Sequence, residues 1–258
     1  MSMALVRIGT LLAILVLLAL QAGCATQHPA APKDERAASD PWEPMNRRVA
    51  AFNDNVDKVS LKPLAKVYDN ALPNFLQTGL HNFFGNLREP LNLVNSLLQG
   101  KPRRGGIATL RFLANTVVGM GGLFDIATDS GLEPVPEDFG QTLAVWGVPD
   151  GPYVVLPILG PRTLRDAFMT PLDMAGDPVM YLKPDSHRAG VAGLRIIDTR
   201  AALFTAEALI EDSFDRYLSI RESYLQNRRY QVYDGDPPVD DDFYDEFYDD
   251  FEEDEPPP

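Results

Sequence analysis

The sequence contains few side chains whose type and spacing suit covalent chemistry. A GxSxG nucleophile elbow and a P-loop are both absent from it. The three histidines show no metal-site spacing: His28, His81 and His187. Three aspartates near glycines are explained more simply as turn or capping residues: Asp125, Asp138 and Asp166. A Ser/His/Asp arrangement is spatial and stays open, but the sequence favours a non-enzymatic protein without metal or cofactor.

The only cysteine, Cys24, ends an N-terminal targeting segment. Arg7 gives a short positive region, and the apolar run 11–20 is too short for a membrane span, which needs roughly 20 residues. Gln21-Ala22-Gly23-Cys24 resembles a bacterial lipobox, although Gln21 departs from the usual aliphatic residue. An ordinary secretory signal is the alternative. We expect Cys24 to carry a lipid anchor, and Ala25 in place of Asp favours the outer membrane.

The segment Gly105–Asp125 combines a broad apolar face with a thin polar seam. Arg111 and Asn115 are four residues apart and share a narrow stripe of the expected helix. A soluble surface helix has the opposite proportions, so this helix is expected in a protein core or against lipid. The two polar residues then either hold helices together through buried hydrogen bonds or line a path for lipid. The apolar face comprises Leu110, Leu113, Val117 and Met120.

Three basic residues stand between this helix and the preceding apolar one: Lys101, Arg103 and Arg104. They are either ordinary solvated loop charges or contacts for lipid headgroups. At a membrane surface each basic residue contributes about 1 kcal/mol to binding of anionic lipid. They are therefore candidates for headgroup contact.

The negative charge is concentrated in the C-terminal segment. The chain of 258 residues has a formal net charge of −14. Residues 234–258 contain 13 acidic residues and no Lys or Arg, which leaves the rest of the chain nearly neutral. Neither part is suited to nucleic acid. The acidic segment is expected to be disordered.

Caps, prolines and glycines predict an all-α body with interrupted amphipathic helices. Asp40 is expected to cap a first helix, and Thr163 with Asp166 another. Glycines 119, 121 and 122 are expected to end the central helix. The run 153–156 is expected to be an irregular or strand-like connection outside any sheet. Further helices are expected over residues 64–72, 139–146, 191–203 and 207–233.

Several long motifs resemble the MlaA (VacJ) family of outer-membrane phospholipid-transport lipoproteins. They follow in the family's order and cover residues 40 to about 233. The motifs are DPWEPMNR (40–47), FNDNV (52–56), GLHNFFGNLREPLNLVNSLLQG (79–100), RFLANTVVGMGGLFDIA (111–127), FGQTLAVWGVPDGPYVVLPILGPRTLRD (139–166) and the pattern Asp215-x-Tyr217, Arg221, Tyr224, Gln226, Arg228. The expected division is a lipoprotein signal peptide (1–23), a flexible tether (24–39), the helical domain (40–233) and the acidic tail (234–258).

The resemblance implies a ring-like helical body in the inner leaflet of the outer membrane, with a polar channel beside trimeric porins. Such proteins remove misplaced phospholipids from the outer leaflet and pass them to a soluble periplasmic carrier, MlaC, without covalent chemistry. Asn53, in FNDNV, is a candidate for a flexible element near the pore and joins Arg111 and Asn115 as a lipid-path residue. A porin-bound scaffold without transport activity and a lipid hydrolase are the alternatives.

Overall fold

The computed structural model describes residues 40–211 and 213–238. Cys24, the expected signal peptide and tether, and most of the acidic tail lie outside these residues. No helix in the described part of the chain is long and apolar enough to cross a membrane. The described body is almost entirely helical, as the sequence predicts.

The first half of the body consists of long helices joined by short breaks. A π-helical turn, Asp57–Leu61, joins the first two into one continuous run. Gly121 and Gly122 adopt positive φ just beyond the helix that ends at Val117, which confirms the predicted end of the central helix at these glycines. The helices are α3 (Glu43–Val56), α4 (Lys62–Ala71), α5 (Asn74–Asn86), α6 (Glu89–Leu98) and α7 (Pro102–Val117).

The second half of the body combines several short elements with three longer helices. Thr163 caps α10 by accepting a hydrogen bond from the Asp166 amide, as predicted. The single helix expected over residues 207–233 is wrong, because Asp215 caps a new helix there by accepting from the amides of Tyr217 and Leu218. The elements are α8 (Ile126–Asp129), α9 (Phe139–Val145), β1 (Tyr153–Leu156), β2 (Gly160–Thr163), α10 (Leu164–Ala175), the 3₁₀ turn Pro178–Tyr181, α11 (Asp185–Ala202), α12 (Phe204–Glu211) and α13 (Arg216–Val232).

A two-stranded hairpin corrects the expectation for residues 153–156. β1 pairs antiparallel with β2 in the register Tyr153 with Thr163 and Leu156 with Gly160. The pairing is held from outside the hairpin. Asn46 of α3 donates to the Tyr153 carbonyl (3.0 Å) and accepts from the Val155 amide (2.9 Å). The sequence around the hairpin does not show this support.

Asp40 also differs from its predicted role. The side chain of Asp40 does not cap α3, which begins at Glu43 without a side-chain cap. Its buried carboxylate instead accepts from Asn46 (2.8 Å), Arg221 (3.4 Å) and the Tyr217 hydroxyl. Asp40 therefore joins the start of α3 to α13.

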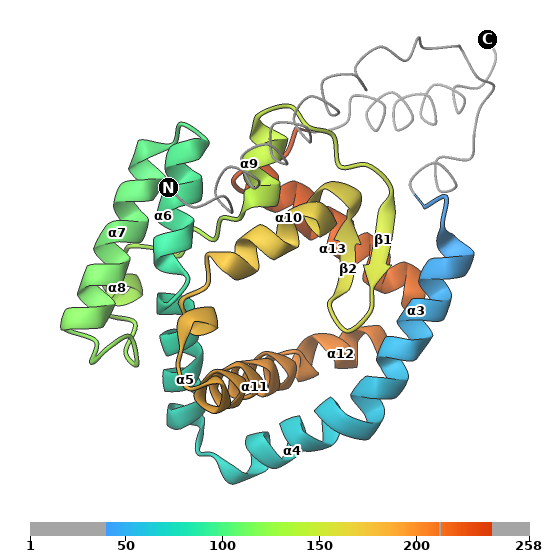
Figure 1. Ribbon diagram of the computed structural model, residues 1–258, viewed down its shortest axis with the longest axis horizontal. Coiled ribbons are helices and arrows are strands. Elements are labelled where there is room, and N and C mark those ends of the chain that lie inside the picture. The colour runs from blue at the N-terminus through green and yellow to red at the C-terminus, as the bar shows by residue number, and fades with distance from the viewer. Residues whose placement is uncertain (1–39, 212, 239–258) are drawn as a thin grey trace, which may run out of the picture. The chain divides into compact units, whose positions relative to one another are not determined.

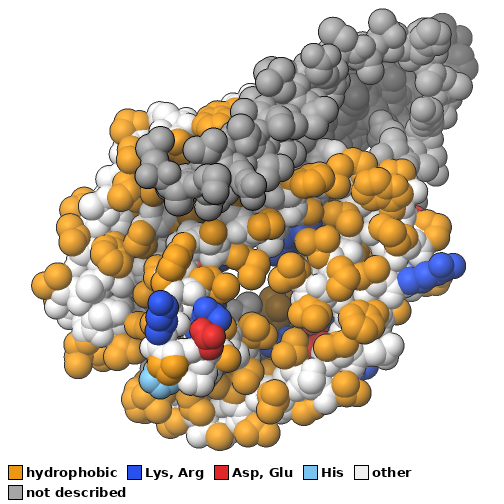
Figure 2. Space-filling model, in the orientation of Figure 1, with side chains coloured by type: hydrophobic (Ala, Val, Ile, Leu, Met, Phe, Trp, Pro, Cys, Tyr) orange, Lys and Arg blue, Asp and Glu red, His pale blue; other side chains and the backbone are white. Residues whose placement is uncertain are grey.

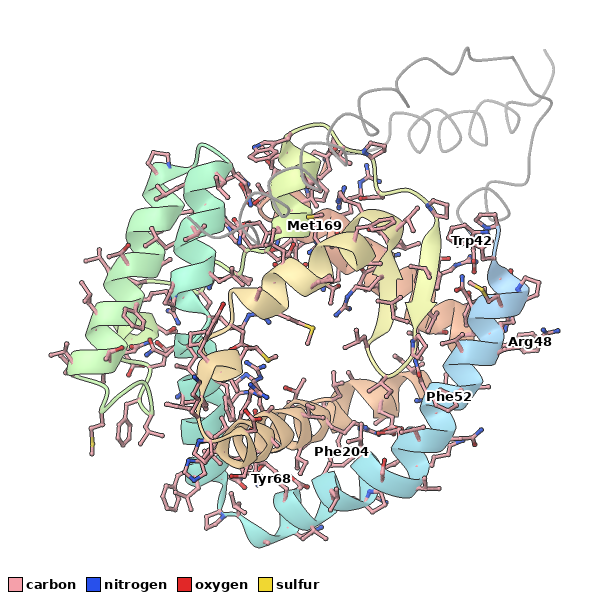
Figure 3. All side chains as sticks on the ribbon, in the orientation of Figure 1. Trp42, Arg48, Phe52, Tyr68, Met169 and Phe204 are labelled. Atoms are coloured by element: carbon pink, nitrogen blue, oxygen red, sulfur yellow. The ribbon has the colours of Figure 1, made fainter. Side chains whose placement is uncertain are left out.

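The described helices form a ring (Figure 1). α3 and α4 make one side, α5 and the α6–α7 pair the opposite side, and α10 with the hairpin closes the ring. α11 lies along the inner side of α4, where Tyr68, Ala65 and Ala201 form a small buried core. Figure 3 shows Tyr68 and Phe204 in this layer, while Arg48 of α3 points away from the ring.

The distribution of side chains is inverted relative to a soluble protein. Among the described residues, buried polar and charged side chains outnumber buried hydrophobic ones, while many large hydrophobic side chains are exposed. Figure 2 shows hydrophobic side chains across most of one face, around a central hollow. The predicted apolar face of the central segment is exposed: Leu110 is 54% exposed, Leu113 51% and Val117 77% in α7, and Met120 just beyond it is 69% exposed.

Candidate functional site

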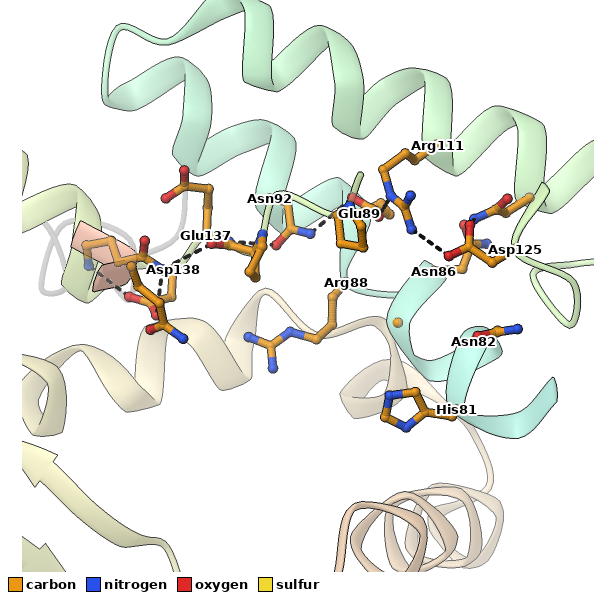
Figure 4. Close-up of a pocket in the computed structure, with 16 residues that line it drawn as sticks. His81, Asn82, Asn86, Arg88, Glu89, Asn92, Arg111, Asp125, Glu137 and Asp138 are labelled. Atoms are coloured by element: carbon orange, nitrogen blue, oxygen red, sulfur yellow. Dashed lines mark hydrogen bonds and ion pairs between the residues drawn. The ribbon is translucent and has the colours of Figure 1, made fainter. Parts of the chain in front are cut away.

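A polar pocket lies where α5, α6 and α7 meet the segment that leads into α9 (Figure 4). Its volume is about 340 Å³. Helical spacing brings one polar stripe of α6 inward at Glu89 and Asn92, and one of α7 at Arg111 and Asn115. The pocket is lined by His81, Asn82, Gly85, Asn86, Arg88, Glu89, Asn92, Arg111, Asn115, Asp125, Pro134, Pro136, Glu137, Asp138, Gln141 and Gln231.

Arg111 is the centre of a buried network in one wall of the pocket. Its guanidinium contacts Glu89 at 2.7 Å and Asp125 at 3.0 Å, and it also donates to Thr128 at 2.9 Å and to the Leu132 carbonyl. Burial lowers the pKa of Arg111, but the hydrogen bonds from its side chain to Glu89 and Asp125 outweigh burial and raise the pKa overall. The arginine therefore stays charged and links α7 to α6 and α8.

Asn115 extends the same network by one turn. Its amide donates to Asp125 at 2.9 Å and accepts from the Ala127 amide at 2.9 Å. Burial raises the pKa of Asp125, but hydrogen bonds from Thr128, Asn115 and Arg111 together lower the pKa to about 2. Arg111 and Asn115 thus hold helices together through buried hydrogen bonds, and both also border the pocket. A role in holding helices together and a role in lining a path for lipid are therefore compatible for this pair.

A second acidic wall is built by Glu137 and Asp138. Glu137 is fully buried and accepts from Gln99 at 2.7 Å and Arg104 at 3.0 Å, and burial raises its pKa. Asp138 is paired with Arg228 at 2.6 Å. Burial raises the pKa of Asp138, but the hydrogen bond from Arg228 and its charge lower the pKa to about 2.

Glycine at position 140 is required by this wall. A Cβ atom there would lie 2.3 Å from the Asp166 carboxylate and 2.5 Å from the Arg228 guanidinium. Arg228 also bonds Asp166 at 2.8 Å, so a larger residue would separate these ions. The motif that begins at Phe139-Gly140-Gln141 is thereby tied to the Asp166–Arg228 ion pair behind the pocket.

The three basic candidates do not line the pocket. Lys101 forms an ion pair with Asp234 at 2.7 Å, and Arg104 contacts Glu137 and Asp234. Asp234, the first residue of the acidic segment, is therefore ordered against the start of α7. Arg103 is exposed and pairs with none of the described residues. Of the three candidates, it alone has its charge uncommitted within the described body.

Asn53 also lies outside this pocket. Its amide donates to the Leu156 carbonyl at 2.9 Å and accepts from the Ile158 amide at 2.8 Å. It borders a second pocket of about 470 Å³, between α3, the hairpin and the start of α13. The structure therefore separates Asn53 from Arg111 and Asn115 and places it in contact with the tip of the hairpin.

The described residues contain no group of His, Cys, Asp or Glu that could hold a metal ion. His81 contacts Asp198 at 3.1 Å, and the Tyr68 hydroxyl donates to the same carboxylate at 2.8 Å. This links α4 and α5 to α11. The candidate site is therefore a polar pocket in a ring with an exposed hydrophobic surface. Internal ion pairs hold the walls of this pocket in place.

Comparison with known proteins gives the family. The sequence profile described as MlaA lipoprotein matches residues 38–231. The chain belongs to the MlaA family. It is 38% identical over 223 residues to the intermembrane phospholipid transport system lipoprotein MlaA of Escherichia coli strain K12, covering 84% of this chain and 86% of that protein. The protein of the same description from Haemophilus influenzae is 34% identical over 225 residues, covering 83% and 86%.

A solved structure agrees with this assignment. It is described as "Structural basis for maintenance of bacterial outer membrane lipid asymmetry" and superposes with a TM-score of 0.66 at 38% sequence identity. The match covers 75% of this chain and 99% of that one. The all-α ring predicted from the resemblance is confirmed at the level of the fold.

In this member of the MlaA family, the pocket contains one cation that the sequence analysis did not single out. Arg88, between α5 and α6, is exposed, and its guanidinium has no hydrogen bond or ion pair with another described residue. Figure 4 shows it directed away from Glu89 and Arg111. Nearby Asp173 of α10 is partly buried, and burial raises its pKa to about 6. The missing partner of Arg88 is a spatial property that no sequence motif signals.

Proposed function

We propose that this protein is a lipoprotein of the bacterial envelope that transports phospholipids. The observation that carries the proposal is the inverted distribution of side chains, with large hydrophobic residues exposed and buried ion pairs lining a polar pocket. Curated relatives over 84% of the chain are described as parts of an intermembrane phospholipid transport system. We infer that lipid accessibility and downstream uptake together supply the direction of transfer.

The arrangement suits the two halves of a phospholipid. A charged headgroup in hydrocarbon without partners costs several kcal/mol or more. The polar pocket offers such partners, while acyl chains remain in contact with the apolar surface. The many large hydrophobic side chains exposed on the described body suit burial partway in one leaflet. Non-helical backbone at Gly119–Gly122 is then covered by protein or faces water.

The finer proposal follows the family resemblance. The body sits in the inner leaflet of the outer membrane, held by acylated Cys24, and faces the periplasm beside a trimeric porin. Phospholipids misplaced in the outer leaflet pass through a polar channel to the carrier MlaC, which preserves lipid asymmetry. Arg111 and Asn115 support the wall of this path, and Asn53 fixes the hairpin that borders the second pocket. Of the three basic candidates for headgroup contact, Lys101 and Arg104 are paired with Asp234 and Glu137, so Arg103 is the one whose charge is available within the described body.

The test is a deletion strain in which outer-leaflet phospholipid is measured. Deletion is expected to raise outer-leaflet phospholipid and sensitivity to detergent with chelator, and the wild-type gene to restore both. Cys24→Ala is expected to restore neither. Normal asymmetry after deletion, with porin still captured by the purified protein, would support the scaffold alternative instead. Release of lyso-lipid or fatty acid by the purified protein would support the hydrolase.

A further inference from the structure

Arg88 is the pocket cation available to a ligand. It is exposed at the break between α5 and α6, and its backbone carbonyl accepts from the amides of Leu91 and Asn92, which fixes the start of α6. The guanidinium is free of hydrogen bonds and ion pairs within the described body, and Figure 4 shows it projecting from the pocket wall. A side chain fixed at its root and unpaired at its tip is suited to bind an anion.

The other guanidiniums of the pocket region are already committed. Arg111 is buried between Glu89 and Asp125. Arg228 makes short contacts with Asp138 and Asp166, and Arg104 pairs with Glu137. Separating any of these buried pairs to receive a ligand would leave a buried charge without a partner, which is strongly unfavourable.

The charge balance of the walls indicates what kind of anion fits. The lining carboxylates are four: Glu89, Asp125, Glu137 and Asp138. Their direct guanidinium partners are Arg111, Arg104 and Arg228, of which Arg228 also serves Asp166. Without Arg88 the walls therefore carry excess negative charge, and the Asp173 carboxyl of α10, on which the charge of Arg88 acts, adds to it. An anion that binds Arg88 neutralises its charge, so the carboxylates of the walls again exceed the cations. A cationic group on the same ligand would offset this excess of negative charge.

We propose that Arg88 binds the phosphate of a phospholipid headgroup and that the acidic walls favour zwitterionic headgroups bearing an ammonium group. This inference rests on the proposed transport function. The planar guanidinium can donate two parallel hydrogen bonds to phosphate oxygens. The ammonium group then lies against the carboxylate walls, which disfavour a headgroup with net negative charge.

The experiment uses the full-length purified protein in phosphate-free detergent buffer. Short-chain phosphatidylethanolamine, short-chain phosphatidylglycerol and inorganic phosphate are titrated separately by calorimetry. The wild type is expected to bind the ethanolamine lipid more tightly than the glycerol lipid, and inorganic phosphate much more weakly than either. Arg88→Gln is expected to weaken binding of the ethanolamine lipid by about tenfold, the loss of one charge-assisted contact, and Arg88→Lys by less.

Arg48→Gln is the matched control, because Arg48 is exposed on α3 and points away from the ring. It is expected to bind all three ligands as the wild type does. Thermal unfolding establishes that the Arg88 variants are folded. Unchanged lipid binding by folded Arg88→Gln overturns the phosphate assignment and leaves the transport function standing. Tighter binding of phosphatidylglycerol overturns the headgroup preference, and equal binding of inorganic phosphate assigns the site to a free anion. Binding of neither lipid by the wild type contradicts the transport function itself.

Discussion

At the scale of residues, the protein places its strongest polar interactions where most soluble proteins place hydrocarbon. The side chains of Arg111 and Glu89 are 5% and 4% exposed and lie 2.7 Å apart. Such a pair contributes little to stability relative to apolar residues of the same size, but removal of one partner is costly. The pair therefore specifies how α6 and α7 align, and it keeps the pocket wall polar.

The Arg111 pair gives the first prediction. Arg111→Met should lower the free energy of unfolding by about 3–5 kcal/mol, because Glu89 and Asp125 lose their shared cation. Chemical unfolding in detergent measures this change. Addition of Glu89→Met should recover part of the loss, whereas Arg48→Met should change stability by less than about 0.5 kcal/mol. A loss no greater in Arg111→Met than in Arg48→Met would contradict the structural role of the network.

Asp173 gives a prediction for pH. Its folded pKa of about 6 lies above the ordinary aspartate value of 3.8, because burial and the charge of Asp138 raise the pKa more than the Phe139 hydrogen bond and the charges of Arg88 and Arg228 lower it. The folded state then binds the proton more tightly, so stability from this group is lost as pH rises from about 4 to about 6. Asp173→Asn keeps an acceptor for the Phe139 amide. It should be about 1 kcal/mol more stable than the wild type at pH 7 after screening is considered, and equal near pH 4. If the variant and the wild type are equally stable at pH 7 as well as near pH 4, the pKa of Asp173 is not raised.

At the scale of elements, two asparagines seven residues apart on α3 hold the hairpin. Asn46 and Asn53 each donate to one backbone carbonyl and accept from one amide of the segment 153–158. Their spacing of two helical turns matches the advance of the strand along α3. The hairpin therefore depends on α3 as well as on its own pairing.

Asn46→Ala should destabilise the protein by about 1–3 kcal/mol, because buried backbone groups of Tyr153 and Val155 lose their partners. Asn53→Ala should cost less, since the Ile158 contact is exposed. Amide exchange at Val155 should accelerate in the first variant and at Ile158 in the second. Asn70→Ala, which removes an exposed bond within α4, serves as the control. Unchanged exchange at both amides would mean that the hairpin holds its own position.

The elements also show which parts of the structure are readable from sequence. The apolar face of α7, its glycine break and the Thr163 cap follow from local spacing, and they are present as predicted. The hairpin could not be predicted in this way. β2 begins with Gly160-Pro161, which is unusual in a strand, and β1 is held by Asn46, over a hundred residues away in the sequence. Arg111 and Asn115 can be identified from a polar seam, whereas Arg88 is distinguished by having no hydrogen bond or ion pair with another described residue, which is a spatial property.

At the scale of the whole molecule, the exposed hydrophobic surface requires a covering. Patches on monomeric soluble proteins seldom exceed a few hundred Å², yet hydrophobic residues extend over much of one face of this ring (Figure 2). A lipid leaflet covers such a surface without specific shape complementarity. The lipid anchor that we propose at Cys24 and this surface would then act as two separate attachments to the membrane.

The surface by itself should hold the protein on lipid. The chain from residue 25 onward, which lacks Cys24, should float with neutral phosphatidylcholine vesicles, and added salt should not release it, because apolar contact is unscreened. Leu113→Glu with Val117→Glu should weaken vesicle binding by about tenfold or more, since both side chains are exposed on α7 and carboxylates resist transfer from water. Ser223→Glu with Asn227→Glu adds the same two charges at the same spacing on α13 and should leave binding unchanged. If the two double variants float equally well, the exposed face of α7 does not contact the membrane, and attachment falls to Cys24 and other surfaces.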